Sequence, residues 1–360
     1  MARLGSWIKA QPEGIYVAPA DAWIDPSRPK AKALITHGHS DHARAGHGAV
    51  LATAETLAIM EVRCGPQNGQ ALAYDETIRV GEVDVRFVPA GHVLGSAQIV
   101  LEHKGERVVV SGDYKRRPDP TCACFVPVPC DIFITEATFG LPVFRHPPAQ
   151  DEIAKLLESV ALFPERAHLV GVYALGKAQR VMALIRAAGH DAPIYLHGAL
   201  EPLTALYKSE GIDLGDTPKA TAAKKSELAG RIVLAPPSAT QDLWSRRLPD
   251  PVTAFASGWM RVRARARQKG VELPLVISDH ADWDDLCGTI AETGAGEVWV
   301  THGQEDALVH WCRTRGLAAR PLHMLGYGDE EEGGVAEAAR LPAGPDETTV
   351  DAAGHTGDSS

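Results

Sequence analysis

The chain has 360 residues, of which 45% are hydrophobic, and its formal net charge is −10 at pH 7. This length predicts two domains, and no apolar run approaches the roughly 18 residues that a membrane span requires. Because residues 1–7 also lack the apolar core of a signal peptide, we expect a cytoplasmic protein without a membrane partner, whose six cysteines are reduced thiols.

The negative charge is concentrated at the C-terminal end of the chain. Residues 329–360 carry nine acidic residues and one basic residue, a net charge of −8, which leaves −2 for residues 1–328. The segment is rich in Gly, Ala, Asp and Glu and has no apolar periodicity, so it is predicted to be a disordered acidic tail. The nearly balanced remainder can carry a local basic groove, and the overall acidity does not exclude a nucleic-acid partner.

Short β-rich runs, each ending in a polar or Gly-containing turn, occupy much of the first 140 residues. A helix is predicted over residues 54–63, where Leu57 and Met60 have near-helical spacing. Strands are predicted over residues 32–35, 85–89, 97–102, 107–110 and 131–135.

The densest group of metal-capable side chains follows the first of these strands. His37, His39, Asp41 and His42 lie within six residues, and imidazole with carboxylate suits zinc or a neighbouring first-row metal. A turn leaving a strand can aim alternate side chains at one point, so His37 and His39 can share an ion. Asp41 and His42 project past it and can reach a second ion. A His-rich loop without metal would explain one histidine pair but explains the full pattern poorly.

Later turns supply further candidate ligands. His92 follows a predicted strand and adds a third imidazole for the first ion, although a lone histidine at a strand end is more often an ordinary polar residue. Gly112 permits a tight turn before Asp113, the natural carboxylate bridge between two ions. His302 follows the strand predicted over residues 298–301 and would complete the second ion.

From about residue 141 helices and strands alternate, which predicts parallel β-α units and a separate sheet. The predicted helices cover residues 151–162 and 177–188, and the predicted strands cover 168–172, 193–196, 231–234 and 252–256. After about residue 273 the first style resumes, with strands over 275–278 and 298–301 that are each followed by a histidine turn. The simplest architecture is a metal domain interrupted by an inserted α/β domain.

The metal-capable residues, taken in order, resemble the metallo-β-lactamase fold. The resemblance lies in His37-x-His39-x-Asp41-His42, followed by His92 and then Asp113. Three further segments narrow it to the β-CASP nucleases. Residues 135–140, which contain Glu136, resemble motif A; residues 278–282, which contain His280, resemble motif B; residues 301–305, which contain His302, resemble motif C.

The resemblance extends over roughly residues 13–325, because residues 173–179 and 257–260 also match segments of the β-CASP insert. Among these nucleases the chain looks most like the bacterial DNA-ligase-associated exonucleases. The resemblance implies an α/β fold, in which a metallo-β-lactamase αββα sandwich is interrupted by a β-CASP domain. It places the sandwich in residues 1–140 and 273–328, the β-CASP domain in 141–272 and the tail in 329–360.

The function implied by the resemblance is that of a two-metal phosphodiesterase, a DNA exonuclease acting in DNA repair or end processing. An ATP-dependent DNA ligase and a helicase are the implied protein partners. The nearest rival is an RNA-processing exonuclease or endonuclease of the same superfamily, because the crosslink-repair DNA branch generally lacks a motif C histidine and His302 is present here. A small-molecule hydrolase would leave the insert unexplained, and non-catalytic scaffolds typically lose metal ligands.

The resemblance also implies a role for each site residue. Two divalent ions, zinc or manganese, are expected, the first held by His37, His39 and His92, the second by Asp41, His42 and His302, with Asp113 shared. Asp41 and Asp113 are thereby part of the catalytic group, together with His280 as general acid and Glu136, which orients the imidazole and keeps it charged. The alternative for His280 is a residue that steadies Asp113 or a water.

Substrate contacts are expected from cations that face the cleft between the domains. The candidates are Lys115, Arg116, Lys177, Arg261 and Arg265. For the run over residues 261–269 a solvated face is an equally good interpretation. Arginines at alternate positions would share one side in a strand, whereas a helix would scatter them.

Overall fold

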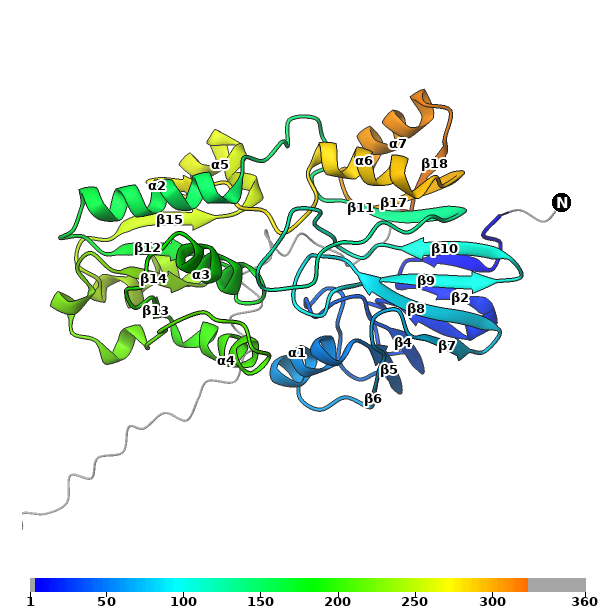
Figure 1. Cartoon of the computed structure of the whole chain (residues 1–360), viewed down its shortest axis with the longest axis horizontal. Coiled ribbons are helices and arrows are strands. Elements are labelled where there is room, and N and C mark those ends of the chain that lie inside the picture. The colour runs from blue at the N-terminus through cyan, green and yellow to red at the C-terminus, as the bar shows by residue number, and fades with distance from the viewer. Residues whose placement is uncertain (1–3, 323–360) are drawn as a thin grey trace, which may run out of the picture.

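The computed structural model describes residues 4–322, so the tail predicted over residues 329–360 lies outside the described residues. The described residues form three β-sheets with helices packed against them (Figure 1). The α/β class predicted from the sequence is therefore found. None of the helices in this part of the chain has the length and apolarity that crossing a membrane requires.

The first sheet has six strands that follow one another in chain order. They are β1 (Ile8–Gln11), β2 (Gly14–Val17), β3 (Ala22–Ile24), β4 (Lys32–Leu34), β5 (Ala49–Ala52) and β6 (Gly69–Ala71). The first three pair antiparallel, and β3 to β6 pair parallel. Helix α1 (Ala54–Cys64) begins after Thr53, whose side chain accepts a hydrogen bond from the N–H of Thr56, and it covers one face of this sheet.

The second sheet has seven strands in the order β18-β17-β11-β10-β9-β8-β7. Their bounds are β7 (Thr77–Val80), β8 (Val83–Pro89), β9 (Ala97–His103), β10 (Glu106–Val110), β11 (Ile132–Ala137), β17 (Glu297–Gly303) and β18 (Ala318–Pro321). Helices α6 (Trp283–Thr293) and α7 (Glu305–Thr314) cover one face.

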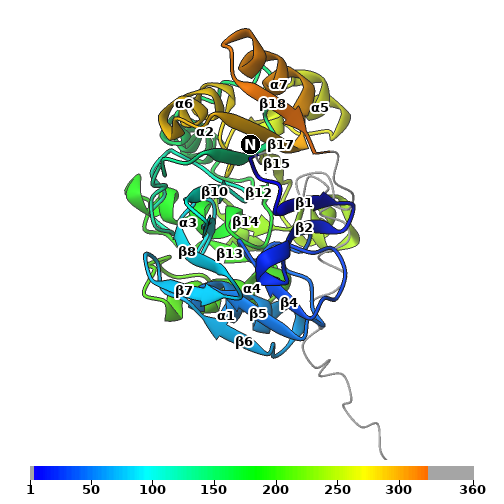
Figure 2. The same ribbon diagram turned by 90° about the vertical axis from the view of Figure 1, so that its right-hand side faces the viewer.

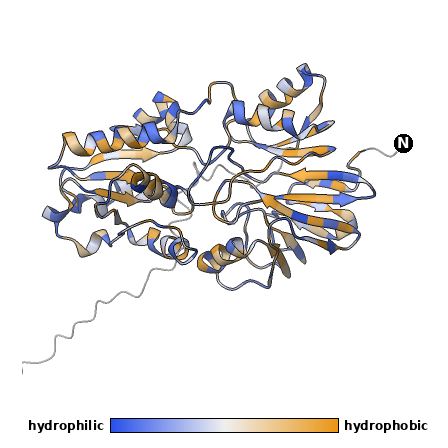
Figure 3. Ribbon diagram, in the orientation of Figure 1, coloured by the Kyte–Doolittle hydropathy of each residue, from blue (hydrophilic) through white to orange (hydrophobic). Residues whose placement is uncertain are grey.

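Alternating side chains of the second sheet join two separate cores, as the period of two in a strand requires. In β10, Val108 and Val110 pack with residues of the first sheet such as Ile24, whereas Val109 packs beneath α6 and α7. The layers therefore run from α1 through the two sheets to α6 and α7 (Figure 2). The central strands of both sheets are correspondingly apolar (Figure 3).

The third sheet has five strands, all parallel, in the order β13-β14-β12-β15-β16, so the predicted parallel sheet is confirmed. Its strands are β12 (His168–Gly171), β13 (Tyr195–Leu196), β14 (Ile232–Ala235), β15 (Val252–Ala256) and β16 (Leu273–Leu275). One face carries the helices α2 (Ala149–Leu162), α3 (Lys177–Ala187) and α4 (Glu201–Ser209). Helix α4 also approaches α1 of the sandwich (Figure 1).

One predicted strand is displaced. The strand expected over residues 275–278 lies at Leu273–Leu275 and pairs with β15 in the third sheet. The chain turns immediately afterwards, because the N–H of Ile277 bonds to the carbonyl of Leu275. The third sheet is thus built from chain between β11 and β17, which are themselves parallel neighbours in the second sheet. The domain limits at residues 140/141 and 272/273 stay a prediction.

Candidate metal centre and active site

The candidate site lies at one edge of the sandwich, where several strands end. Because β10, β11 and β17 are neighbouring parallel strands, their carboxyl ends meet at the same edge of the second sheet. Asp113 follows β10, and Glu136 and His302 stand near the ends of β11 and β17. The loop after β4 adds His37, and the loop between β8 and β9 adds His92. Segments far apart in sequence thereby bring metal-capable side chains to one place.

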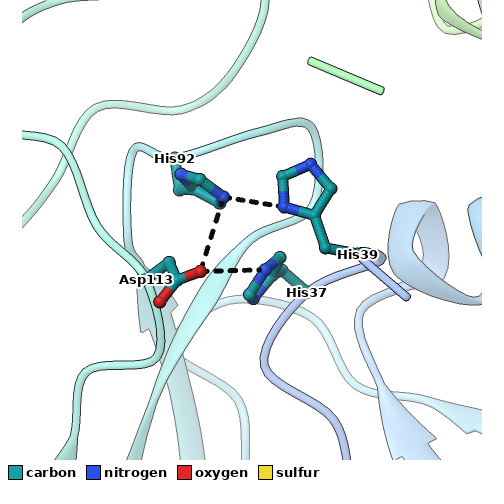
Figure 4. A group of neighbouring side chains, drawn as sticks. All are labelled: His37, His39, His92 and Asp113. Atoms are coloured by element: carbon teal, nitrogen blue, oxygen red, sulfur yellow. Dashed lines mark hydrogen bonds and ion pairs between the residues drawn. The ribbon is translucent and has the colours of Figure 1, made fainter. Parts of the chain in front are cut away.

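Four of the predicted ligands form one buried group. His37, His39, His92 and Asp113 each offer a ligand atom within 4.8 Å of the others (Figure 4). The facing nitrogens of His39 and His92, Nδ1 and Nε2, are 3.0 Å apart. Asp113 Oδ2 lies 3.5 Å from His37 Nε2 and 3.9 Å from His92 Nε2. The atoms that would ligate an ion therefore converge.

The remaining predicted ligands lie beside the same aspartate. His42 Nε2 is 3.4 Å from Asp113 Oδ2 and 3.6 Å from Asp41 Oδ2. The His302 ring lies 5.1 Å from the His42 ring, measured between centroids. The structure thus brings all the predicted ligands together around Asp113.

Asp25, which the sequence analysis did not single out, orients two of these histidines. Its Oδ2 accepts hydrogen bonds from His42 Nδ1 at 2.8 Å and from Thr36 Oγ1 at 2.6 Å. Since the Thr36 hydroxyl donates to Asp25, its oxygen accepts from His37 Nδ1 at 3.0 Å. With Nδ1 of each ring engaged in these bonds, His37 and His42 turn their Nε2 atoms toward Asp113.

Backbone carbonyls orient the other two histidines. His92 Nδ1 donates to the carbonyl oxygen of Asp279 at 2.8 Å, so its Nε2 lone pair faces the cluster. His39 Nε2 lies 3.4 Å from the carbonyl oxygen of Leu175, which leaves Nδ1 to face His92. Leu175 precedes α3 and Asp279 follows β16, so segments that flank the third sheet help to arrange the ligands.

Burial keeps most of these histidines neutral. It holds the pKa of His37 and of His92 well below the ordinary value and lowers the pKa of His302 to about 4, and neighbouring histidines add to the effect. His42 differs: burial opposes its charge, but the carboxylates beside it raise its pKa well above the ordinary value. Burial likewise opposes ionisation of Asp113, yet His42 and other histidines hold its pKa well below the usual range.

The donor set fits a divalent metal ion. Within residues 4–322, His37 Nε2 and Asp41 Oδ1 are buried and have no hydrogen-bond partner, a costly arrangement in a protein interior unless a ligand compensates it. Imidazole nitrogens and carboxylate oxygens are the ligands that zinc and similar ions take. The buried His/Asp cluster is therefore a site for divalent metal.

His280 stands beside this cluster, on the loop between β16 and α6. Its Nδ1 lies 3.0 Å from Glu136 Oε2, and its ring centroid lies 4.6 Å from that of His92. Glu136 is fully buried, and its Oε1 also accepts a hydrogen bond from the N–H of Tyr114 at 2.7 Å. The carboxylate is thereby fixed, whereas the His280 side chain is 11% exposed. The pair combines an immobilised anion with an imidazole that reaches solvent.

Close backbone packing fixes the end of β17, which carries His302. The pairing of β11 with β17 shifts register between Thr135 and Ala137. His302 and Gly303 both have positive φ, 57° and 85°. A Cβ on Gly303 would overlap the carbonyl oxygen of Ala137, so only glycine fits this position without displacement.

Two cations that were predicted to contact substrate are buried, and this prediction needs correction. The side chains of Lys115 and Lys177 are each 1% exposed and pair with Asp119 at 2.6 Å and Asp279 at 3.1 Å. A phosphate in the solvent cannot reach ammonium groups that are already enclosed and neutralised. The sequence pattern showed the cations but not the carboxylates that the fold places beside them.

Arg116, the third of the predicted substrate contacts, is partly exposed but also compensated. Its NH2 group donates to both carboxylate oxygens of Glu292, at 2.9 and 3.0 Å. Its NH1 group donates to Thr289 Oγ1 at 3.1 Å. Arg116 thus holds the loop after β10 against α6.

The last two predicted contacts lie in a helical segment. Gly258–Arg261 forms a 3₁₀ turn, and helix α5 (Arg263–Gln268) follows it. The alternate arginines are therefore scattered around a helix and do not share one side, as they would in a strand. Arg261 is exposed, and the Arg265 guanidinium carbon lies 3.9 Å from the centroid of the Trp259 ring.

Comparison with known proteins gives several relatives, although no protein-family model matches the chain. A protein of Opitutus terrae named as a probable DNA ligase is 29% identical over 317 positions, which cover 85% of this chain and 30% of that protein. A ribonuclease of Thermus thermophilus is 26% identical over 381 positions, which cover 82% of this chain and 86% of the ribonuclease. An RNase J-like protein of Methanocaldococcus jannaschii is 30% identical over 162 positions, 41% of this chain and 38% of that protein.

The first two matches cover similar shares of this chain but very different shares of the two relatives. The chain spans less than a third of the Opitutus terrae protein but most of the Thermus thermophilus ribonuclease. Most of this chain is thus similar both to part of a much longer protein and to most of a shorter one.

Proposed function

We propose that this chain, which belongs to the metallo-β-lactamase-fold nucleases of the β-CASP group, is a metal-dependent phosphodiesterase that acts on DNA. The observation that carries the proposal is the buried cluster around Asp113 with the His280–Glu136 pair beside it. Phosphodiester hydrolysis needs charge neutralisation, an activated water and a protonated leaving group. Metal ligands next to a solvent-reaching imidazole can provide all three.

The cluster is proposed to hold two divalent ions, zinc or manganese. His37, His39 and His92 would hold one ion, Asp41, His42 and His302 the other, and Asp113 would bridge them. When bound, the ions would neutralise charge on the phosphate and make a water acidic enough to attack near neutral pH. Asp25 and the carbonyl of Asp279 would contribute by fixing the ring orientations before the ions bind.

His280 is proposed as the general acid. Glu136 accepts the hydrogen bond from its Nδ1 at 3.0 Å, which fixes the ring and favours the protonated imidazole. The proton on Nε2 would pass to the leaving oxygen as the phosphorus–oxygen bond breaks. Glu136 itself is buried and would not touch the substrate.

Arg261 and Arg265 are the remaining proposed phosphate contacts, because the two lysines are buried and Arg116 is paired with Glu292. Both stand in the segment around Trp259, whose ring centroid lies 4.8 Å from that of Phe139 in motif A. Phe139 in turn lies 6.1 Å from His280, ring to ring. This chain of contacts brings the arginine segment near the proposed general acid, where a bound strand would pass.

The choice of DNA depends on the relative named as a probable DNA ligase, which aligns with 85% of this chain. An exonuclease that trims ends would serve DNA repair or end processing, with an ATP-dependent ligase and a helicase as partners in the cytoplasm. The second candidate is an RNA-processing exonuclease or endonuclease. It is favoured by the ribonuclease relative, 86% of which aligns with this chain.

The deciding experiment uses the full chain loaded with zinc or with manganese. End-labelled DNA and RNA, each single- and double-stranded, are incubated with it and with Asp113→Ala as the matched inactive variant. We expect metal-dependent, stepwise shortening of DNA, a metal content close to two ions per chain, and no activity in the variant. Cleavage of RNA alone would favour the second candidate, and full activity after complete metal removal would refute both.

A further inference from the structure

Five buried charged side chains connect α3 with the loops that carry His92 and His280. They are Lys115, Asp119, Lys177, Arg180 and Asp279, and we call them the ion-pair cluster. Their side chains are between 1% and 6% exposed. Burying this much charge is costly unless the partners compensate one another, so its placement behind the metal site needs an explanation.

The contacts within the cluster are continuous. Lys115 Nζ donates to Asp119 Oδ2 at 2.6 Å, and Asp119 lies 3.3 Å from Arg180 Nε. Arg180 NH1 donates to Asp279 Oδ1 at 2.9 Å, and Lys177 Nζ lies 3.1 Å from Asp279 Oδ2. Asp279 is thus held by two cations of α3, Lys177 and Arg180. Burial alone would raise the pKa of its carboxyl, but Lys177, Lys115 and Arg180 hold it well below the usual range.

The cluster also reaches the backbone around the site. Lys177 Nζ donates to the carbonyl oxygen of Ile277 at 2.7 Å, and Arg180 donates to that of Ser278. Lys115 Nζ donates to the carbonyl oxygen of His92 at 3.2 Å. The backbone before Asp279 and the backbone of His92 are therefore fixed by the same group of charges.

From this geometry we infer that the ion-pair cluster is a positioning device for the metal site. It holds the Asp279 carbonyl against His92 Nδ1, which fixes the tautomer and direction of that ligand, and it sets the loop that continues into His280. The inference rests on the proposed function, because it concerns the metal site assigned there. Lys115 and Lys177 are accordingly positioning residues and not substrate contacts.

The charge balance of the cluster offers a clean variant. It contains three cations and two carboxylates, so Lys177→Met leaves two of each. Asp279 keeps Arg180 as its partner in this variant. We expect this variant to fold, as judged by circular dichroism. Lys115→Met has the same charge balance and removes the bond to the His92 carbonyl. Lys225→Met is the matched control, because this lysine is exposed and does not belong to the ion-pair cluster.

The main measurement is zinc affinity, determined by competition with a chelator and without nucleic acid. We expect Lys177→Met and Lys115→Met to weaken it by about 10- to 100-fold, the usual effect of removing a group that orients a ligand, and the control to leave it unchanged. The cobalt(II)-loaded variants should show an altered visible absorption spectrum. Nucleic-acid affinity of the metal-free protein and its salt dependence should stay at the wild-type values.

The opposite pattern would overturn the inference. Unchanged zinc affinity with weaker nucleic-acid binding and a flatter salt dependence would make the lysines substrate contacts. If neither lysine variant folds, the cluster serves the fold rather than the site, which also overturns it. An absence of nuclease activity would refute the proposed function. The effect of the lysine variants on zinc affinity could still be interpreted, because it is measured without substrate.

Discussion

At the scale of single residues, the proposed roles of His280 and the metal ligands can be separated. His280 bonds to Glu136, and with Asp113 these two form a second group of metal-capable side chains, which shares only Asp113 with the buried cluster of four. We expect His280→Ala to keep its metal but to lose about 10²- to 10⁴-fold in kcat, the usual contribution of a general acid. The measurements are metal content and single-turnover cleavage, with His310→Ala, at an exposed histidine, as the control.

A substrate with a better leaving group also tests whether His280 acts as the general acid. Because such a leaving group needs less protonation, it should partly restore the rate of His280→Ala and change the wild-type rate little. Loss of an ion from the variant would instead make His280 part of the metal site, and the general-acid role would be wrong.

His146 provides a test of how buried histidines affect stability. Burial lowers the pKa of this imidazole to about 3, with Arg117 adding to the effect, and its ring packs edge-on against Phe139 with centroids 4.6 Å apart. In the unfolded chain a histidine pKa is about 6.5, so between pH 6.5 and 3 the unfolded state binds a proton that the folded state does not. The folded state therefore loses stability as the pH falls through this window.

We expect His146→Leu to remove this dependence while keeping the apolar contact with Phe139. The free energy of unfolding of metal-free wild type should fall more steeply between pH 6.5 and 3 than that of the variant, by up to about 1.4 kcal/mol per pH unit. Urea denaturation at several pH values measures it, with His310→Leu as the control. Parallel curves for wild type and His146→Leu would mean that the histidine titrates alike in both states.

Sequence reasoning singled out the proposed ligands but not the residues that orient them. The ligands share a local signature, because each metal-capable side chain follows a predicted strand. Asp25 also follows a strand directly, but this strand, β3, is only three residues long and was not predicted. The pairing of Lys177 with Asp279 had no local signal at all, since the two residues meet only when α3 packs against the loop after β16.

At the scale of elements, Gly303 tests whether the backbone at the end of β17 sets the metal site. We expect Gly303→Ala to be destabilised by about 1–3 kcal/mol, because alanine must adopt positive φ and its Cβ must also displace the backbone of Ala137. Since His302 is the preceding residue, metal content should fall as well. Thermal unfolding and metal analysis measure the two effects.

Gly105 separates backbone strain from steric overlap. It lies in the turn between β9 and β10 with φ 81°, but a Cβ there would meet nothing within 4 Å. The free energy of unfolding of Gly105→Ala should therefore fall only by the cost of a positive φ in alanine, and the variant should keep its metal. Equal losses in the two variants would mean that the contact with Ala137 contributes nothing.

Most elements were predictable, and the errors have local causes. The parallel sheet followed from alternating helices and strands, but β16 was displaced because the apolar run continues past Leu275 while the backbone turns. Short strands such as β1 and β6 were not predicted, since three or four residues give little periodicity. The helix α5 remained an open alternative because alternating arginine and alanine fits either structure.

At the scale of the whole molecule, the distribution of charge matters more than its total. Residues 1–328 carry a net charge of only −2, and much of the positive charge near the site is already paired internally, as for Arg116 with Glu292. Charge available for a nucleic acid is thus limited to segments such as that of Arg261. Competition from the acidic residues 329–360 would then be strongest at low ionic strength.

Deleting residues 329–360 tests this balance. The truncated chain loses a net charge of −8, and because the metal site lies within residues 4–322, we expect its folding and metal content to be unchanged. Nucleic-acid affinity should be equal or higher, by up to about tenfold at low salt, since carboxylates no longer compete with phosphates for the same cations. Fluorescence anisotropy over a range of salt concentrations measures it, and a variant with the acidic residues of 329–360 changed to amides controls for length. If truncation abolished binding while the amide variant bound normally, residues 329–360 would themselves contact the nucleic acid.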